Sequence, residues 1–192
     1  MKEKKKWTEG SSFWGVLWFA VLVLIDQLTK ILSQVFLKER ISFLGDWLAL
    51  ELVYNPGIAY GIGSDAKPIV KIIVIALTCA IMLAIAVAYF FVDKKRKLIR
   101  TAFVFIVAGG IGNLIDRVYY KVWNITADMQ NVGVRDMVDL HKFGFAVCNF
   151  ADFFITAGAV MLVLALLFFD KDAIFPVGKY KKMQREKEGD VK

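Results

Sequence analysis

Four long apolar stretches constrain this chain more than any other feature of its sequence. An α-helix needs roughly 20 predominantly apolar residues to cross a hydrocarbon core about 30 Å thick. The chain of 192 residues is 58% hydrophobic and has a mean hydropathy of +0.55, values that soluble domains of this length rarely approach. The sequence therefore predicts a mainly α polytopic membrane protein with four transmembrane helices. The four stretches are residues 13–37, 69–92, 98–115 and 153–169.

Clusters of basic residues at the boundaries of these stretches predict how the chain is oriented. Most of the Lys and Arg lie in KEKKK (2–6), DKKRK (93–97) and KYKKMQREK (179–187). The longer segments 38–67 and 117–151 hold only seven between them. Because basic residues are enriched in cytoplasmic loops, we expect both termini in the cytoplasm and the two long connections outside. The net charge of +7 lies at membrane boundaries, so no nucleic-acid partner is expected.

The connection between the first two apolar stretches differs in its pattern from the rest. ISFLGDWLALELVY (41–54) is rich in β-branched, aromatic and alternating residues and predicts a strand or hairpin. YNPGIAYG (54–61) follows, and its Asn-Pro and glycines predict a turn. Together they predict a small extracytoplasmic β-sheet at the membrane surface. We expect one membrane-embedded domain over residues 1–192, with its body at about 13–170 and flexible basic cytoplasmic tails at 1–12 and 171–192.

Polar side chains in and beside the apolar stretches gather at one depth. An ionisable residue inside a membrane is a candidate functional residue by default. Lys71 and Arg100 are exceptions that lie near one end of a span, and both are expected to snorkel. The helix rise places the others near the outer boundary. They are Asp26 and Lys30 in the first helix, Asn113, Asp116 and Arg117 at the end of the third, Asp136 and Asp139 in the following loop, and Asp152 at the start of the fourth.

Each of these residues also has a purely structural interpretation, but none explains why several carboxylates share one layer. Asp and Asn are common helix caps, and opposite charges four residues apart on a helix often pair. The structural alternatives are a helix cap for Asp152, for which Asn149 is equally suited, a packing pair for Asp26 and Lys30, structural ion pairing of Asp116 and Arg117 with neighbours, and a solvated loop charge for Asp139 beside His141.

Two carboxyl groups a few ångströms apart in a low dielectric cannot both ionise, so they share one proton. Such a pair can hold a water molecule between a base and an acid and hydrolyse a peptide bond. A small transporter or assembly factor that binds ions is the main alternative, although transporters usually have more spans. A Ser/Lys peptidase is a second, but Ser33 and Ser42 lack the required setting. His141 is the only histidine, so no metal site and no cofactor is expected.

Five short motifs carry a resemblance to a known family. They occur in the same order as in that family and on the expected topology, over roughly residues 13–170. The chain thereby resembles the bacterial lipoprotein signal peptidases, also called type II signal peptidases. The motifs are DQLTK (26–30), YNPGIAYG (54–61), the glycine-rich GGIGNLIDR (109–117), VRDM (134–137) and NFAD (149–152).

The resemblance implies a membrane aspartic endopeptidase of the bacterial cytoplasmic (inner) membrane. Such enzymes remove the signal peptide from diacylglyceryl-modified prolipoproteins and cut before the lipidated cysteine. By position, Asp136 and Asp152 would be the catalytic pair near the outer (periplasmic) surface, and Asp139 is the competing assignment for the first of them. Asp116 is assigned to structural pairing. Residues that would bind substrate or support the site are Asp26, Lys30, Asn55, Gly57, Asn113, Arg117 and Asn149.

Three residues depart from the family pattern without touching a carboxylate. Cys148 stands where Phe is usual, Arg135 lies inside the VRDM motif, and Tyr60 replaces the more usual Phe. These changes concern the shape of the substrate pocket rather than the chemistry. The partners implied by the resemblance are the diacylglyceryl prolipoprotein and membrane lipid, and we expect the chain to act as a monomer without a metal.

Overall fold

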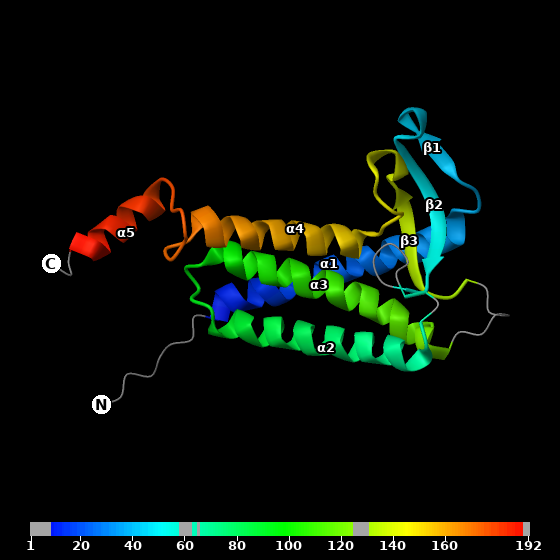
Figure 1. The fold of residues 1–192 in the computed structure, drawn as a ribbon, viewed down its shortest axis with the longest axis horizontal. Helices are drawn as coiled ribbons and strands as arrows, with labels where there is room; N and C mark the ends of the chain where they lie inside the picture. The colour runs from blue at the N-terminus through cyan, green and yellow to red at the C-terminus, as the bar shows by residue number, and fades with distance from the viewer. Residues whose placement is uncertain (1–8, 58–62, 65, 125–130, 190–192) are drawn as a thin grey trace.

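The computed structural model describes residues 9–57, 63–64, 66–124 and 131–189 (Figure 1). Three parts of the sequence-based predictions lie outside the described residues. They are the basic segment 2–6, residues 58–61 of the predicted turn with its Tyr60, and the end of the C-terminal tail at 190–192.

Four long apolar helices lie side by side and form the body of the described structure (Figure 1). Each is long and apolar enough to cross a membrane, which confirms the four predicted spans. Helix α3 is central, because 56% of its apolar window is buried inside the protein, against 6–17% in the other three. The helices are α1 (Glu9–Phe36), α2 (Pro68–Phe91), α3 (Lys97–Tyr119) and α4 (Phe150–Leu164), which a π-helical turn continues over Ala165–Phe169.

Small residues let α3 and α4 approach closely. A Cβ atom on Gly109 would lie 2.3 Å from the carbonyl oxygen of Ala151, which is nearer than a real side chain can come. Contacts of this kind are typical of helix interfaces in membranes, where packing replaces the hydrophobic effect as the driving force. The close approach brings the start of α4 against the last turns of α3, and both carry predicted site residues.

A three-stranded antiparallel sheet lies at one end of the helix bundle (Figure 1). Strands β1 (Ile41–Phe43) and β2 (Leu48–Asn55) form the predicted hairpin. Strand β3 (Val134–Asp139) pairs with β2, with Val53 opposite Asp136 and Ala49 opposite Asp139. The segment of β3 was expected to be a loop, and that expectation is wrong. All six of its residues are buried, so it lacks the alternation of polar and apolar residues that indicates a half-exposed strand.

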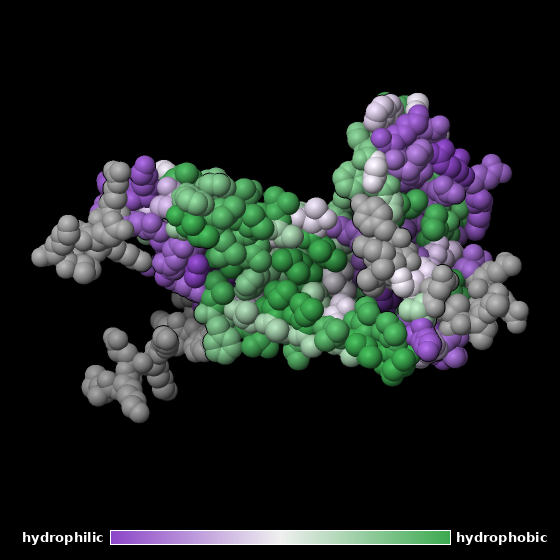
Figure 2. Space-filling model, in the orientation of Figure 1, coloured by the Kyte–Doolittle hydropathy of each residue, from purple (hydrophilic) through white to green (hydrophobic). Residues whose placement is uncertain are grey.

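Hydrophilic surface covers the two ends of the molecule, and apolar surface covers the helices between them (Figure 2). One hydrophilic region lies over the sheet. The other lies at the opposite end, where Figure 1 shows α5 (Lys179–Gly189). Within the tail at 171–192, which was expected to be flexible, residues Lys179–Gly189 form this helix. Gln184 donates to the carbonyls of Lys171 and Ala173 and holds this helix to the preceding turn.

Arg100 is buried, so the expectation that it snorkels is wrong. Its guanidinium donates to the carbonyl oxygens of Tyr89 and Val92 at 2.9 and 3.1 Å and lies 4.0 Å from the centre of the Tyr89 ring. The last carbonyls of a helix have no partner within the helix, and Arg100 supplies one at the end of α2. It therefore joins α2 to α3 instead of reaching for the headgroups.

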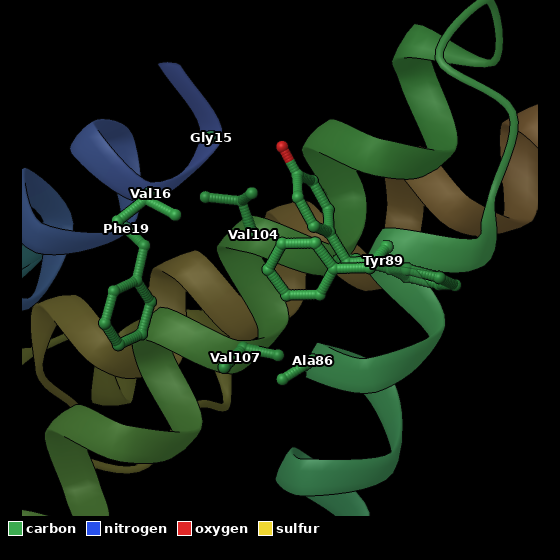
Figure 3. Close-up of a pocket in the computed structure, with 9 residues that line it drawn as sticks. Gly15, Val16, Phe19, Ala86, Tyr89, Val104 and Val107 are labelled. Carbon is green, nitrogen blue, oxygen red and sulfur yellow. The ribbon is translucent and has the colours of Figure 1, made fainter. Parts of the chain in front are cut away.

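An apolar cavity of about 160 Å³ lies between α1, α2 and α3 beside this contact (Figure 3). Val16, Phe19, Val104 and Val107 line it, and Tyr89 packs against Gly15, where an added Cβ would collide with the tyrosine hydroxyl. Its lining holds no carboxylate. The carboxyl groups predicted to be catalytic lie at the other end of the bundle.

Candidate active site

Asp136 and Asp152, the predicted catalytic pair, meet across Asn149. The side-chain amide of Asn149 donates to Asp136 Oδ1 at 2.6 Å, and its backbone N–H donates to Asp152 Oδ2 at 3.0 Å. Asp136 comes from β3, not from a loop, and Asp152 comes from the first turn of α4. One fully buried asparagine therefore bridges two carboxyl groups from different elements.

Asn149 and Asp152 also begin helix α4. Asn149 is the N-cap and accepts from the backbone N–H of Asp152, while Asp152 accepts from the backbone N–H of Asn149. This reciprocal pair is a capping box, which satisfies two helix donors at once. The structural interpretation of Asp152 as a helix cap thus holds together with its position beside Asp136. The cap fixes the Asp152 carboxylate and leaves it partly exposed.

A second set of contacts supports Asp152 from below. Asn113 on α3 donates to Asp152 Oδ1 at 2.8 Å, and its own Oδ1 accepts from Lys30 at 3.0 Å and from Asn149 at 2.9 Å. Lys30 forms the expected pair with Asp26 at 2.9 Å, and both side chains are fully buried. Asp26 in turn accepts from the backbone N–H of Ala151 at 2.9 Å. The first span is therefore joined directly to the start of the fourth.

A third set of contacts supports Asp136 from the sheet. Asn55 at the end of β2 donates to Asp136 Oδ2 at 3.3 Å, and its own Oδ1 accepts from the backbone N–H of Gly57 at 3.0 Å. Arg117 donates to the carbonyl oxygen of Gly57 at 3.2 Å. All nine residues predicted for the site thus belong to one connected set of hydrogen bonds and ion pairs.

Asp116 forms a structural ion pair, as expected, and its partner is Arg135 rather than Arg117. Asp116 is fully buried and binds Arg135, with its two oxygens 2.7 and 3.1 Å from the guanidinium nitrogens. Arg135 was interpreted only as a mild departure from a motif, so its contact with Asp116 was missed. A signal was present in the sequence, since a basic residue inside a segment flanked by valines has to find a buried acid.

The environment of Asp136 favours its protonated form. Burial, and then the negative charge of Asp152, raise the pKa of the Asp136 carboxyl to about 7, although hydrogen bonds from Asn149 and Asn55 act in the opposite direction. Neutral amide donors stabilise a carboxylate less than a cation would. Asp136 therefore keeps its proton up to a pH close to neutral.

Asp139 is not a solvated loop charge, so that expectation is wrong. It ends β3, is only 4% exposed, and lies 3.1 Å from the guanidinium of Arg40. Burial alone would raise the pKa of this carboxyl, but hydrogen bonds from His141 and Arg40 hold it below its usual range. Among the described residues, no hydrogen bond or shared asparagine joins Asp139 to Asp152, so the geometry favours Asp136 as the partner of Asp152.

Other reactive groups near the pair do not offer a second chemistry. Burial, together with the nearby carboxylates, raises the pKa of the Cys148 thiol to about 12, so this thiol stays protonated and is a poor nucleophile. Among the residues that the structure describes, no group of three or more His, Cys, Asp or Glu side chains could hold a metal ion. The arrangement is suited to acid–base activation of water.

Known proteins resemble this chain over most of its length. The lipoprotein signal peptidase of Borrelia hermsii (strain HS1 / DAH) is 30% identical over 163 residues, which cover 80% of this chain and 89% of that protein. The lipoprotein signal peptidase of Pelagibacter ubique (strain HTCC1062) is 34% identical over 156 residues, which cover 78% of this chain and 85% of that protein.

A solved structure shares the fold. It is described as a bacterial membrane enzyme obtained by the in meso method at 2.3 Å resolution, and its TM-score with this chain is 0.66 at 26% identity. The alignment covers 86% of this chain and 93% of that structure. The combination of membrane helices and a small sheet is therefore that of a known class of membrane enzyme.

Residues 18–168 match the family model Peptidase_A8, described as signal peptidase (SPase) II. The match begins in α1 and ends in the π-helical turn after α4, so it includes every described element that contributes to the site. It favours a peptidase over the transporter or assembly factor considered above. This chain is a multi-pass membrane peptidase and belongs to the signal peptidase II family.

Proposed function

We propose that this chain removes the signal peptide from diacylglyceryl-modified prolipoproteins, with Asp136 and Asp152 as the catalytic pair and a cut before the lipidated cysteine. The family supports the removal of signal peptides from prolipoproteins. One observation carries the proposed mechanism. A single buried asparagine holds one oxygen of each carboxyl group, and the pair has no cation bound directly to it in the described structure.

The surroundings of the two aspartates suggest different roles for them. Asp152 lies in the first turn of α4, where the helix dipole and two hydrogen-bond donors stabilise its negative charge. Asp136 is buried, and its raised pKa keeps it protonated close to neutral pH. In the resting enzyme Asp152 is therefore the base and Asp136 the acid.

The reaction then needs only these two groups and one water molecule. Asp152 takes a proton from the water molecule, and the water oxygen bonds to the scissile carbonyl carbon. At the same time Asp136 gives its proton to the carbonyl oxygen. The tetrahedral diol collapses, and the C–N bond breaks. The proton on Asp152 passes to the leaving amine, and a diol hydroxyl returns a proton to Asp136. The leaving amine is that of the lipidated cysteine, and the new carboxyl group ends the signal peptide.

The seven other predicted residues position the pair or the substrate in this proposal. Lys30, Asn113 and Asn149 hold the two carboxyl groups in register. Asn55 links Asp136 to Gly57, whose carbonyl accepts from Arg117. The remaining member, Asp26, anchors Lys30 and the start of α4.

The site is proposed to lie near the outer surface of the cytoplasmic membrane, with both termini in the cytoplasm. Two basic segments support this orientation, the connection at 93–97 and helix α5 (Lys179–Gly189). Both lie at the end of the bundle opposite the sheet (Figure 1). The apolar surface between the two ends would contact membrane lipid (Figure 2). We propose a monomer, because all the groups of the mechanism come from one chain.

The proposal is tested with detergent-purified protein and a synthetic diacylglyceryl prolipoprotein. Mass spectrometry should find one cut before the lipidated cysteine. In ¹⁸O-water the released signal peptide should gain one ¹⁸O at its new carboxyl group, and hydroxylamine should trap no acyl-enzyme. Asp152→Asn should abolish the cut. A hydroxylamine-sensitive acyl-enzyme, or full turnover by Asp152→Asn, would show that water is not activated by this pair.

A further inference from the structure

Arg135 lies directly before Asp136 on β3, but it binds a different set of residues. Neighbouring side chains on a strand point to opposite faces. The guanidinium of Arg135 donates to Gln34 at 3.1 Å and to Gln27 at 3.4 Å, both on α1, and it is only 6% exposed. Together with its contacts to Asp116 on α3, these bonds fasten β3 to two membrane helices one residue before the catalytic carboxyl.

Asp116 holds the main chain of Arg135 as well as its side chain. Asp116 Oδ2 accepts from the backbone N–H of Arg135 at 2.9 Å, in addition to the two guanidinium contacts. Three bonds from one fully buried carboxylate therefore fix the backbone immediately before Asp136. A bidentate contact fixes both the direction and the distance of the guanidinium, whereas the ammonium group of a lysine would fix only the distance.

The same carboxylate connects Arg135 to the support of Asp152. Asp116 Oδ2 lies 3.8 Å from Lys30 Nζ, and Lys30 also pairs with Asp26. Asp26, Lys30, Asp116 and Arg135 thus form a buried row of alternating charges, called here the charge quartet, whose sum is zero. Lys30 donates to Asn113, which binds Asp152. A change at Arg135 would therefore alter the position or the electrostatic surroundings of both proposed catalytic aspartates.

We propose that Arg135 is a positioning residue that acts through Asp116, fixing β3 so that Asp136 faces Asp152 and keeping the charge quartet neutral. The inference rests on the proposed function, because it assigns a role toward that same pair. Without Arg135, Lys30 would serve two buried carboxylates, and the quartet would carry one net negative charge beside the pair.

The expected pH dependence follows from the groups around Asp136. A negative charge nearby disfavours ionisation of a carboxyl, so the loss of Arg135 would raise the pKa of Asp136 further above its present value of about 7. Activity that needs the shared proton would then persist to higher pH. The titratable and charged groups that face Asp136 are Asp152 on α4, Lys30 on α1, Arg117 on α3 and Cys148 before α4, and β2 contributes the neutral Asn55.

The test compares four variants in cleavage of the diacylglyceryl prolipoprotein, with kcat, KM and the pH profile of kcat/KM measured for each. Arg135→Gln should lower kcat about a hundredfold, because small displacements of catalytic groups have effects of that size. The alkaline limb of its profile should move up by about one pH unit or less, while KM changes little. Arg135→Lys keeps the charge but not the two-pronged contact. This variant should keep the alkaline limb of the pH profile at its wild-type position, and its kcat should fall about tenfold.

A charge-balanced double variant separates positioning from general damage and also protects the test if Arg135→Gln fails to fold. Arg135→Gln with Asp116→Asn removes both members of the pair, leaves no unpaired buried charge, and should return the alkaline limb to its wild-type position. Arg40→Gln is the matched control, since Arg40 also binds an aspartate of β3 but stands outside the quartet. It should keep wild-type kcat and pH profile.

Two results would overturn the inference. One is a wild-type kcat and pH profile in Arg135→Gln. The other is a loss of kcat in Arg135→Gln with no movement of the limb and an equal loss in Arg40→Gln, which would indicate general destabilisation of the sheet. Failure of the proposed function looks different, because Asp136→Asn and Asp152→Asn would then stay active whatever Arg135→Gln does.

Discussion

Strand β3 places two aspartates in contrasting surroundings, Asp136 near its middle and Asp139 at its end. Asp136 and Asp139 are three residues apart, and they are only 3% and 4% exposed. Asp136 faces two neutral amides and a second carboxyl group, whereas Asp139 faces the guanidinium of Arg40 and the backbone N–H of His141. The pKa of Asp136 is raised to about 7, and that of Asp139 is lowered.

The contrast shows that partners act together with burial to decide what a buried carboxyl group does. Both side chains are almost fully shielded from water, but only Asp139 gains a directly bound cation, whereas Lys30 acts on Asp136 from a distance. A carboxyl group with neutral donors and a like-charged neighbour keeps its proton near neutral pH and can act as an acid. A carboxylate paired with arginine stays ionised and serves to join elements. One strand thus carries a chemical group and a structural group.

The largest expected difference between the two aspartates is in activity. Asp136→Asn should lower kcat/KM by about a thousandfold or more, since it removes the acid of the pair. Asp139→Asn should stay within about threefold of wild type, because it changes only a structural contact. Cleavage of a diacylglyceryl prolipoprotein in detergent measures both. If Asp139→Asn were inactive and Asp136→Asn active, the pair would be wrongly assigned and the contrast would be reversed.

The helices were predictable from the sequence because each span carries its signal in consecutive residues. Length and hydropathy alone give four spans, and the i,i+4 spacing of Asp26 and Lys30 gives their ion pair. The roles of Asp136 and Asp152 came from motifs whose chemistry requires two acids. These roles stay a prediction, and the structure adds the asparagine that contacts both carboxyl groups.

What could not be predicted depends on contacts between distant parts of the chain. Strand β3 has no alternation because both of its faces are buried, so it resembled a loop. Asp139 was taken for a solvated charge because Arg40, its partner, is 99 residues away in the sequence. Asp116 was expected to pair structurally, but its partner was not identified, because Arg135 lies 19 residues further along the chain on β3. Sequence proximity is a poor guide to partners once a sheet folds back on a helix bundle.

A smaller loss of activity is expected from a change at Asn149, the asparagine that contacts Asp136. Asn149→Ala removes the amide that holds Asp136 Oδ1 and the cap of α4. It should lower kcat about a hundredfold, because the two carboxyl groups lose their shared support. Asn124→Ala is the matched control, since Asn124 is exposed and ends the short helix Val122–Asn124 away from the pair. Equal kcat in the two variants would show that the bridge has no part in catalysis.

A further difference is expected in stability, whose dependence on pH differs between the two aspartates. The folded-state pKa of Asp136 lies above the ordinary value of 3.8, so ionising this carboxyl costs folding free energy as the pH rises from about 4 to about 7. Asp136→Asn escapes that cost. Its stability relative to wild type should therefore rise over this range by at most about 4 kcal/mol, at roughly 1.4 kcal/mol per pKa unit, and then level off.

Asp139 has the opposite sign. Because its folded-state pKa is lowered, the stability it contributes is fully present above the ordinary pKa of 3.8 and is lost only as the pH falls through the folded-state pKa. In a His141→Asn background, which removes the imidazole that binds Asp139 and ordinarily titrates in this range, Asp139→Asn should thus show a constant deficit between pH 4.5 and 8, as measured by the free energy of unfolding in detergent. A sloping difference for Asp139→Asn together with a flat one for Asp136→Asn would mean that the cation at Arg40 does not separate the two aspartates. The distinction between them would then have to come from exposure, which is nearly the same for both.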